Sequence, residues 1–397
     1  MSVRRILIVG ASVAGVQAAE SLRTMGFEGD VIVLDAQDEL PYNRPPLSKE
    51  LLTGELDEDD IRLLTPQLVD ELVLDLRLAS PARHLDLNNC AVHTEHGEIP
   101  YDQLVIATGA APIMPTPWTD VPNVMALRTL ADARCIHTAF STGRPTVVVV
   151  GGGFIGCELA AAARQRGLDV TIVEAESQLM ARALPPSAAA PLQTAHIQAG
   201  VHLRLGAAVA ALHGAGPVER VELADGQMLD ADLVVVGIGA RPATTWLSGS
   251  GLAIDDGVLT DETLRARRGV YAIGDVARWS DHRRPQSQRV EHWTNARAHG
   301  VVVAHNLLHP DTPRIVSDLP YVWSDQYGRR LQIIGDSLAD DVAFVTQGPM
   351  GAGYLALIGD GKHVVGAVGY AQERSFRRAR KVVADHARWD EVDQLAW

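Results

Sequence analysis

The sequence has no paired cysteines. Cys90, Cys135 and Cys157 stand far apart, and no C-x-x-C or C-x-x-x-x-C pair occurs. This spacing excludes a redox dithiol and argues against a cysteine-ligated zinc or iron–sulfur site within the chain. Three buried thiols in a reducing cytosol are the simplest expectation. We therefore predict no metal site.

Long apolar runs and an excess of positive charge are also missing. No apolar stretch is long enough to cross a bilayer, and the first strand begins by Arg4 or Arg5, which leaves no room for a signal peptide. The 397 residues carry a formal net charge of -14, which argues against a nucleic-acid binder. We expect a soluble, cytoplasmic protein of two or three domains that binds neither nucleic acid nor membrane.

The stretch from Thr146 to Glu174 carries the clearest motif. Its run of valines is typical of a strand buried on both faces. Gly151, Gly153 and Gly156 then fit G-x-G-x-x-G: the first glycine makes the turn, the second admits a pyrophosphate and the third lets the helix pack. Glu174 ends the next strand, where a carboxylate binds a ribose 2′-hydroxyl and repels a 2′-phosphate. The pattern predicts a dinucleotide site; a tight turn in an ordinary α/β unit is the alternative.

The chain opens with a second copy of this pattern. A strand from Arg5 to Val9 leads into Gly10 and Gly15, and a second strand ends at Asp35. Ser12 replaces the middle glycine, which weakens the match without breaking it, because a serine is small and its hydroxyl can bond a phosphate. The chain is therefore expected to hold two nucleotide-binding units.

A proline-rich segment after the first unit carries Arg44 and Lys49. Two prolines stiffen it, and Ser48 is expected to cap a short helix that starts around Lys49. A plain loop is the alternative. Because this segment follows a dinucleotide unit in the sequence, however, these two cations become candidates to face a phosphate or a flavin ring. Lys49 stands out further because Lys362 and Lys381 are the only other lysines.

Several buried strands end in small or acidic residues, where backbone can approach a ligand. Asp275 follows such a strand and is a candidate to accept a sugar-like hydroxyl, with a helix or turn cap as the alternative. A helix then starts near Trp293 and extends to about Leu308; its positive end suits a flavin's N1–C2=O edge. The candidate positions at these strand ends and this helix start are Thr108, Gly109, Gly239, Gly274, Asp275, Glu291, His292 and Trp293.

Prolines mark the predicted domain boundaries. They cluster from Pro112 to Pro122, Pro242 opens the way back, and the texture changes near Arg314. We predict a discontinuous first domain at 1–113 and 242–314, a second at 114–241 and a third at 315–397. In the third, Arg374, Arg377, Arg378 and Lys381 share one helix face. This is either a solvated face or a docking site for an acidic partner.

Taken together, the motifs resemble a known family. The pieces are residues 44–49 (Arg-Pro-Pro-Leu-Ser-Lys), residues 151–158, residues 272–275 (Ala-Ile-Gly-Asp) and residues 323–326 (Trp-Ser-Asp-Gln). The chain resembles the FAD-dependent NADH:ferredoxin reductases of the putidaredoxin reductase and biphenyl dioxygenase reductase type, in the pyridine-nucleotide-disulfide oxidoreductase superfamily. This implies an α/β fold with two three-layer, Rossmann-like domains of the glutathione-reductase type and a C-terminal α+β interface domain.

The resemblance also implies roles for individual residues. Lys49 would lie near the flavin and pair with Glu158 beside the nicotinamide path, and Trp293 would contact the isoalloxazine; these three are the predicted catalytic residues. FAD would be held by Gly10, Ser12, Ala14, Gly15, Asp35, Arg44, Lys49, Ala82, Thr108, Gly109, Arg128, Gly274, Asp275, Glu291, His292 and Trp293. NADH would be held by Gly151, Gly152, Gly153, Ile155, Gly156, Glu158, Glu174, Arg182 and Gly239.

The implied activity is electron transfer from NADH through FAD to an acidic 2Fe-2S ferredoxin that feeds a cytochrome P-450 or a Rieske-type oxygenase. The ferredoxin would dock near Trp293, Trp323 and the basic face of Arg374, Arg377, Arg378 and Lys381. No cysteine stands near Ser48, which favours electron transfer over thiol or peroxide chemistry. An NADH oxidase or peroxidase, a rubredoxin reductase and an NADH-sensing binding flavoprotein are the alternatives.

Overall fold

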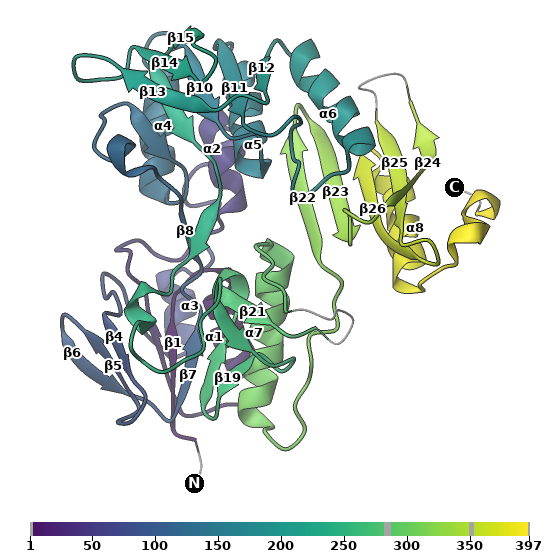
Figure 1. The fold of residues 1–397 in the computed structure, drawn as a ribbon. Helices are drawn as coiled ribbons and strands as arrows, with labels where there is room; N and C mark the ends of the chain where they lie inside the picture. The colour runs from purple at the N-terminus through teal and green to yellow at the C-terminus, as the bar shows by residue number, and fades with distance from the viewer. Residues whose placement is uncertain (1–2, 282–286, 349–352, 396–397) are drawn as a thin grey trace. The chain divides into compact units, whose positions relative to one another are not determined.

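The computed structural model describes residues 3–281, 287–348 and 353–395. Its chain divides into two units, each compact in itself (Figure 1). The short segment Arg44–Asp57 belongs to unit 2, although the sequence analysis placed it in the first domain. The outermost predicted domain limits, residues 1 and 397, lie outside the described residues. Unit 1 comprises Met1–Asn43, Glu58–Ala111 and Arg241–Asp318, and unit 2 comprises Arg44–Asp57, Pro112–Ala240 and Leu319–Trp397.

Unit 1 is built on a six-stranded sheet with the order β19-β20-β7-β1-β2-β3. Every pairing is parallel except that of the edge strand β19 with β20. The carboxyl ends of the five parallel strands therefore meet at one edge, where open α/β sheets bind ligands. The bounds are β1 Arg5–Val9, β2 Asp30–Leu34, β3 Leu74–Arg77, β7 Gln103–Ile106, β19 Arg265–Arg267 and β20 Val270–Ala272.

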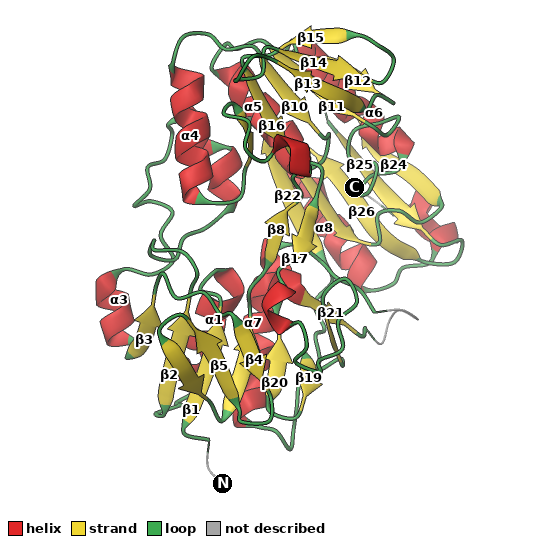
Figure 2. Cartoon of the chain, turned by 60° about the vertical axis from the view of Figure 1, so that its left-hand side comes forward, coloured by secondary structure: helices red, strands yellow, loops and turns green. Residues whose placement is uncertain are grey.

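Alternate residues of the strands in unit 1 build two separate cores. Ile6 and Ile8 pack with residues of helices α1 (Val13–Thr24) and α7 (Trp293–Leu308). Leu7 and Val9 point the other way, into a core shared with β4 (His84–Asp86), β5 (Ala91–Thr94) and β6 (Gly97–Pro100). The result is helices, parallel sheet and antiparallel sheet in three layers (Figure 2).

Unit 2 repeats this plan with a five-stranded, all-parallel sheet of order β12-β11-β10-β16-β9. Val148 and Val150 of β10 pack toward the antiparallel sheet β13-β14-β15, and α5 (Phe154–Gln165) packs against β10 and β11. The strands are β9 Val124–Ala126, β10 Val147–Val150, β11 Val170–Glu174, β12 His202–Leu205, β13 Val209–His213, β14 Arg220–Leu223, β15 Met228–Asp230 and β16 Leu233–Val236.

The C-terminal part of unit 2 is a five-stranded antiparallel sheet with helix α8 (Glu373–Ala384) packed on it. Phe376 and Val383 of α8 are buried in a core with Leu355 and Leu357, which leaves the basic residues of α8 exposed. In sheet order, the strands are β22 Tyr321–Gln326, β23 Arg329–Gly335, β26 Val364–Tyr370, β25 Tyr354–Gly359 and β24 Asp341–Gln347.

The α/β fold predicted from the sequence is confirmed. Helix α7 lies where the sequence placed it, and helix α6 spans Pro186–Gln198. Nowhere in the described residues does a helix combine the length and apolar character needed to cross a membrane. The remaining elements are α2 Glu50–Thr53, α3 Pro66–Glu71, α4 Leu130–Ser141, β8 Ala110–Pro112, β17 Ala240–Pro242, β18 Val258–Thr260, β21 Ala277–Trp279 and the 3-10 turns Pro45–Ser48, Thr116–Trp118, Thr245–Leu247, Gly274–Val276 and Trp389–Gln394.

Candidate cofactor sites and the Lys49–Glu158 cluster

The first glycine loop joins β1 to α1 in unit 1. Gly10 has a φ of +111°, and a Cβ atom there would lie 2.2 Å from the carbonyl oxygen of Ala107. A Cβ at Gly15 would lie 1.9 Å from the oxygen of Gly10. Both positions therefore require glycine. The close turn leaves the first N–H groups of α1 at the carboxyl edge of the sheet, which suits a pyrophosphate.

Asp35 ties this loop to the end of β2. Its Oδ2 accepts a hydrogen bond from the backbone N–H of Ala11 at 2.7 Å, and its Oδ1 accepts one from Gln37 at 2.8 Å. Ser12 is the N-cap of α1 in extended conformation, so its side chain is tolerated at the helix start. The structure thus brings Gly10, Ser12, Ala14, Gly15 and Asp35 together.

Two further strand ends reach the same edge. After β7, the Thr108 hydroxyl donates to the carbonyl of Ala243 at 2.9 Å, and Gly109 has a φ of +67°. After β20, the N–H of Gly274 donates to Nδ1 of His299 at 3.1 Å. His299 is fully buried, and burial lowers its pKa to about 3, so the ring is neutral and Nδ1 is free to accept. Sequence reasoning missed His299, since a lone histidine inside a helix matches no motif.

The start of α7 holds the predicted flavin contacts of unit 1. His292 is the N-cap, and its buried Nδ1 has no hydrogen-bond partner among the described residues. Trp293 donates from Nε1 to Oδ1 of Asn43 at 3.0 Å, and the Arg297 guanidinium lies 5.5 Å from its ring centroid.

Arg289 also links several of these elements. Its guanidinium pairs with Glu291, donates to the carbonyl oxygen of Asp275 at 3.4 Å and pairs with Asp256 at 3.2 Å. Arg289 therefore bonds to two predicted FAD-binding residues, Asp275 and Glu291. Ala82 lies half-buried between β3 and β4. An orphaned buried nitrogen, a glycine cradle and an acid at the end of β2 together fit a flavin dinucleotide.

The glycine loop of unit 2 repeats the geometry of the first. Gly151 has a φ of +106°, and a Cβ there would lie 2.4 Å from the oxygen of Gly237; a Cβ at Gly156 would lie 2.0 Å from the oxygen of Gly151. Glu174 accepts from the N–H of Gly152 at 2.5 Å, as Asp35 does from Ala11. A Cβ at Gly153 would meet nothing within 4 Å. The space in front of Gly153 fits an approaching dinucleotide.

Three other predicted NADH contacts lie in unit 2. Arg182 donates to the carbonyl of Ile238 at 3.3 Å, and its guanidinium comes within 3.4 Å of the position of a Cβ on Gly239. Ile155, in the first turn of α5, exposes 40% of its surface. An apolar side chain exposed beside a glycine loop is consistent with contact to a flat ring.

Lys49 and Glu158 form a buried ion pair in unit 2. The Lys49 Nζ lies 3.1 Å from Oε1 of Glu158, with side-chain exposures of 10% and 4%. Ser48 donates to the other carboxylate oxygen, and Ser324 donates to Oε1 at 2.6 Å. Burial raises the pKa of Glu158, and Lys49 and the two hydroxyls act against this rise. The expectation that Ser48 caps α2 is wrong, because its hydroxyl is directed to Glu158 instead.

Unit 2 also contains the two predicted FAD-contacting arginines. Arg44 donates from its guanidinium to the carbonyl oxygen of Arg128 at 2.9 Å, so the structure brings these two residues together. Arg44, Lys49 and Arg128 thus belong to unit 2, whereas the other predicted FAD residues belong to unit 1.

The cysteine prediction was only partly right. Cys157 is buried in α5, but Cys90 and Cys135 are exposed. Cys90 has a φ of +50°, and the turn before β5 leaves it at the surface. The sequence could not show this, since an apolar residue at a turn is not forced inward.

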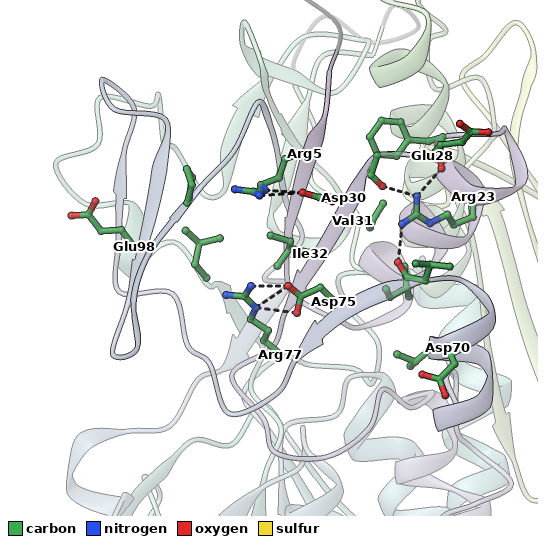
Figure 3. A pocket seen from close by; sticks show the side chains of 17 residues that line it. Arg5, Arg23, Glu28, Asp30, Val31, Ile32, Asp70, Asp75, Arg77 and Glu98 are labelled. Carbon is green, nitrogen blue, oxygen red and sulfur yellow. Dashed lines mark hydrogen bonds and ion pairs between the residues drawn. The ribbon is translucent and has the colours of Figure 1, made fainter.

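A surface hollow of about 920 Å³ lies elsewhere on unit 1 (Figure 3). Its lining includes Arg5 and Asp30 at the amino ends of β1 and β2, together with Leu74, Asp75 and Arg77 of β3, and it contains no residue of the glycine loop from Gly10 to Gly15. Its arginines are already engaged: Arg5 pairs with Asp30, and Arg77 pairs with Asp75. This hollow is therefore not the dinucleotide site.

Two glycine loops of one design, each closed by an acid at the end of the following strand, are typical of a protein that binds two dinucleotides. Residues 4–300 match the model of the pyridine nucleotide-disulphide oxidoreductase family, and residues 321–396 match the reductase C-terminal family. The chain belongs to the pyridine nucleotide-disulphide oxidoreductase family. The predicted class of enzyme and its cofactor pair, FAD and NAD, are confirmed at the level of the family.

Individual relatives are similar along most of the chain. Rhodocoxin reductase of Rhodococcus erythropolis is 35% identical, with 96% of this chain and 89% of the relative covered. The ferredoxin–NAD(+) reductase component of the biphenyl dioxygenase system of Paraburkholderia xenovorans is 35% identical, with 84% and 81% covered. Putidaredoxin reductase, in its covalent complex with putidaredoxin, matches with a TM-score of 0.91 and 29% identity over 96% of this chain and 93% of the other.

Proposed function

We propose that this chain is an NADH-dependent ferredoxin reductase of an oxygenase system. The observation that carries the proposal is the buried Lys49–Glu158 pair beside the glycine loop of unit 2. It places a fixed cation, rather than a cysteine, in the segment from Arg44 to Lys49 that resembles the flavin-facing segment of such reductases. When bound, FAD would take a hydride from NADH and release electrons singly.

The protein's own groups would bind and orient. In unit 1, the N–H groups at the start of α1 and the Asp35 carboxylate would hold FAD, with Gly274, Asp275 and His292 at the neighbouring elements. In unit 2, the open backbone at Gly153 would admit the NADH pyrophosphate, and Glu174 would repel a 2′-phosphate. Lys49 would keep a positive charge near the flavin, held in place by Glu158. None of these side chains needs to transfer a proton.

The electron acceptor would be an acidic 2Fe-2S ferredoxin. Supporting this, Arg374, Arg377, Arg378 and Lys381 are exposed on α8 in a chain of formal net charge -14. Trp323 stacks on Tyr321, and Arg380 of α8 lies over that tyrosine at 5.0 Å, which links the aromatic pair to the basic helix. Trp293 of unit 1 would also contact the ferredoxin.

The proposal is tested by acceptor specificity. We expect anaerobic NADH to bleach the purified flavoprotein, and cytochrome c reduction to depend on an added 2Fe-2S ferredoxin. A rubredoxin in the same assay tests the rubredoxin reductase alternative, and rapid oxygen consumption without any acceptor would indicate an oxidase. A colourless protein that cannot be reconstituted with FAD would refute the proposal.

Charge reversal tests the docking face. Because opposite charges at an interface mainly speed association, Arg377→Glu with Arg378→Glu should raise the apparent KM for ferredoxin roughly tenfold. Ferricyanide reduction should not change. Arg267→Glu with Arg268→Glu, an exposed adjacent pair in unit 1, is the matched control. Equal loss in both double variants would reject α8 as the docking site.

A further inference from the structure

A line of four hydrogen bonds runs through unit 2 from the hairpin of β22 and β23 to Glu158. Its members are Tyr327, His196, Gln326, Ser324 and Glu158. The Tyr327 hydroxyl is 2.7 Å from Nδ1 of His196, whose Nε2 is 2.9 Å from Oε1 of Gln326. Nε2 of Gln326 is 2.9 Å from the Ser324 hydroxyl, which is 2.6 Å from Glu158.

The direction of every bond follows from the carboxylate end. An ionised carboxylate only accepts hydrogen bonds, so the Ser324 hydroxyl donates its single hydrogen to Glu158. The Ser324 oxygen must then accept from the amide of Gln326. The oxygen of Gln326 then faces His196, which must carry its proton on Nε2. Nδ1 is left to accept from the Tyr327 hydroxyl. All four donors therefore point toward Glu158, and aligned donors polarise one another.

The residues in the middle of this series of hydrogen bonds are buried. His196 and Ser324 are 0% exposed and Gln326 is 1% exposed. Burial lowers the pKa of His196 to about 4, so the ring is neutral and keeps the single N–H proton that this series of hydrogen bonds requires. At the far end Tyr327 has a φ of +55° and Gly328 a φ of +69°, in the two-residue turn between Gln326 and Arg329. A tyrosine is strained there, which the bond to His196 helps to offset.

We propose that Ser324, Gln326 and His196 are positioning residues that hold Glu158 in its ionised form and, through it, fix the ammonium group of Lys49. The C-terminal part of unit 2, which supplies Ser324 and Gln326, and helix α6, which supplies His196, thus set the charge of the Lys49–Glu158 pair. The functional consequence rests on the proposed function of that pair. The groups that face Glu158 are Lys49 and the hydroxyls of Ser48 and Ser324. The neighbouring thiol of Cys157 and phenol of Tyr327 have raised pKa values and stay protonated.

The test measures the ionisation of Glu158 in the FAD-bound protein. The carbonyl stretch of a protonated buried acid is followed by infrared difference spectroscopy against pH, with Glu158→Gln assigning the band. Ser324→Ala should raise the pKa of Glu158 by about one unit or more, because one hydrogen bond to a charged group is lost. Ser324→Thr keeps a hydroxyl, so the pKa of Glu158 in this variant should stay at the wild-type value.

Matched variants separate positioning from a general loss of packing. Ser337 donates to the carbonyl of Ala183 at 2.7 Å, also in unit 2, and Ser337→Ala should leave the pKa of Glu158 unchanged. Tyr327→Phe removes only the far hydroxyl and should give a smaller shift of the same sign; it supplies the test should Ser324→Ala fail to fold. No shift in either variant, or an equal shift in Ser337→Ala, overturns the inference.

A second readout tells failure of this inference from failure of the proposed function. Ser324→Ala and Lys49→Ala should both change the midpoint potential of bound flavin. If the pKa of Glu158 moves and the potential does not, the hydrogen-bonded chain is supported and the role of Lys49 beside the flavin is rejected.

Discussion

Gly153 offers the sharpest separation between folding and cofactor binding. It is the N-cap of α5, with φ -78° and ψ -168°, a conformation open to any residue. A Cβ there would touch nothing within 4 Å, whereas a Cβ at Gly156 would lie 2.0 Å from a carbonyl oxygen. Gly153→Ala should therefore affect cofactor binding and hardly change stability, whereas Gly156→Ala should destabilise the fold.

The magnitudes follow from these contacts. Gly153→Ala loses roughly 0.5–1 kcal/mol as a poorer N-cap and regains about 0.4–1 kcal/mol from the less flexible unfolded chain, so its stability should hardly change. Gly156→Ala forces backbone apart and should cost about 1–3 kcal/mol. If the methyl group added in Gly153→Ala displaces one charge-assisted hydrogen bond to the pyrophosphate, about 1.5–3 kcal/mol is lost, which corresponds to a roughly 10- to 150-fold loss in the affinity for NADH.

The assay measures denaturant midpoint, FAD content and the dissociation constant of a nicotinamide dinucleotide on the same preparations. We expect Gly153→Ala to keep the midpoint and the FAD and to lose NADH binding. Ser12 occupies the corresponding position in unit 1 with φ -95° and ψ -169°, so the backbone accepts a side chain there. Unchanged NADH binding in Gly153→Ala would refute the placement of the pyrophosphate.

Two further outcomes follow from buried or anchored groups. Glu174→Gln removes the charge and keeps an acceptor for the N–H of Gly152, so the preference for NADH over NADPH should fall about tenfold, and an unchanged ratio of kcat/KM would contradict the role of the charge. Acid should destabilise the fold below about pH 6.5, because burial lowers the pKa values of His196, His292 and His299 to about 4, 4 and 3, and an unfolded histidine binds its proton near pH 6.5. The unfolded state then binds more protons between these values, so stability is complete above pH 6.5 and falls with pH by about 1.4 kcal/mol per unit for each histidine that stays neutral. His299→Gln should flatten the profile of denaturant midpoint against pH, and an identical slope would count against a buried neutral histidine.

The sequence predicted the parts of the site that depend on local pattern. Valine runs, glycine spacing and an acid one strand later are read within 30 residues, and Gly151, Gly156 and Glu174 lie as that reading required. The assignment of Arg44–Asp57 to unit 2 was not predictable, because a proline-rich loop carries no periodicity that says which domain it packs on. His196 and His299 were missed, and Gln326 was noted only as part of the motif at residues 323–326, for a related reason: each bonds to a partner that is remote in sequence.

The two glycine loops differ at one chemically important position. Asp35 and Glu174 each accept from the residue after the first glycine and from the residue two places beyond the acid itself, so both loops are anchored alike. A shared anchor cannot tell one dinucleotide from the other. The selection of one dinucleotide over the other must therefore come from groups that only one of the two units carries. Unit 1 adds a hydroxyl at Ser12 and the orphaned nitrogen of His292, and unit 2 has an open Gly153 at the position of Ser12. A resident cofactor gains from extra fixed polar partners, whereas a substrate that must leave at every turnover is better served by bare backbone.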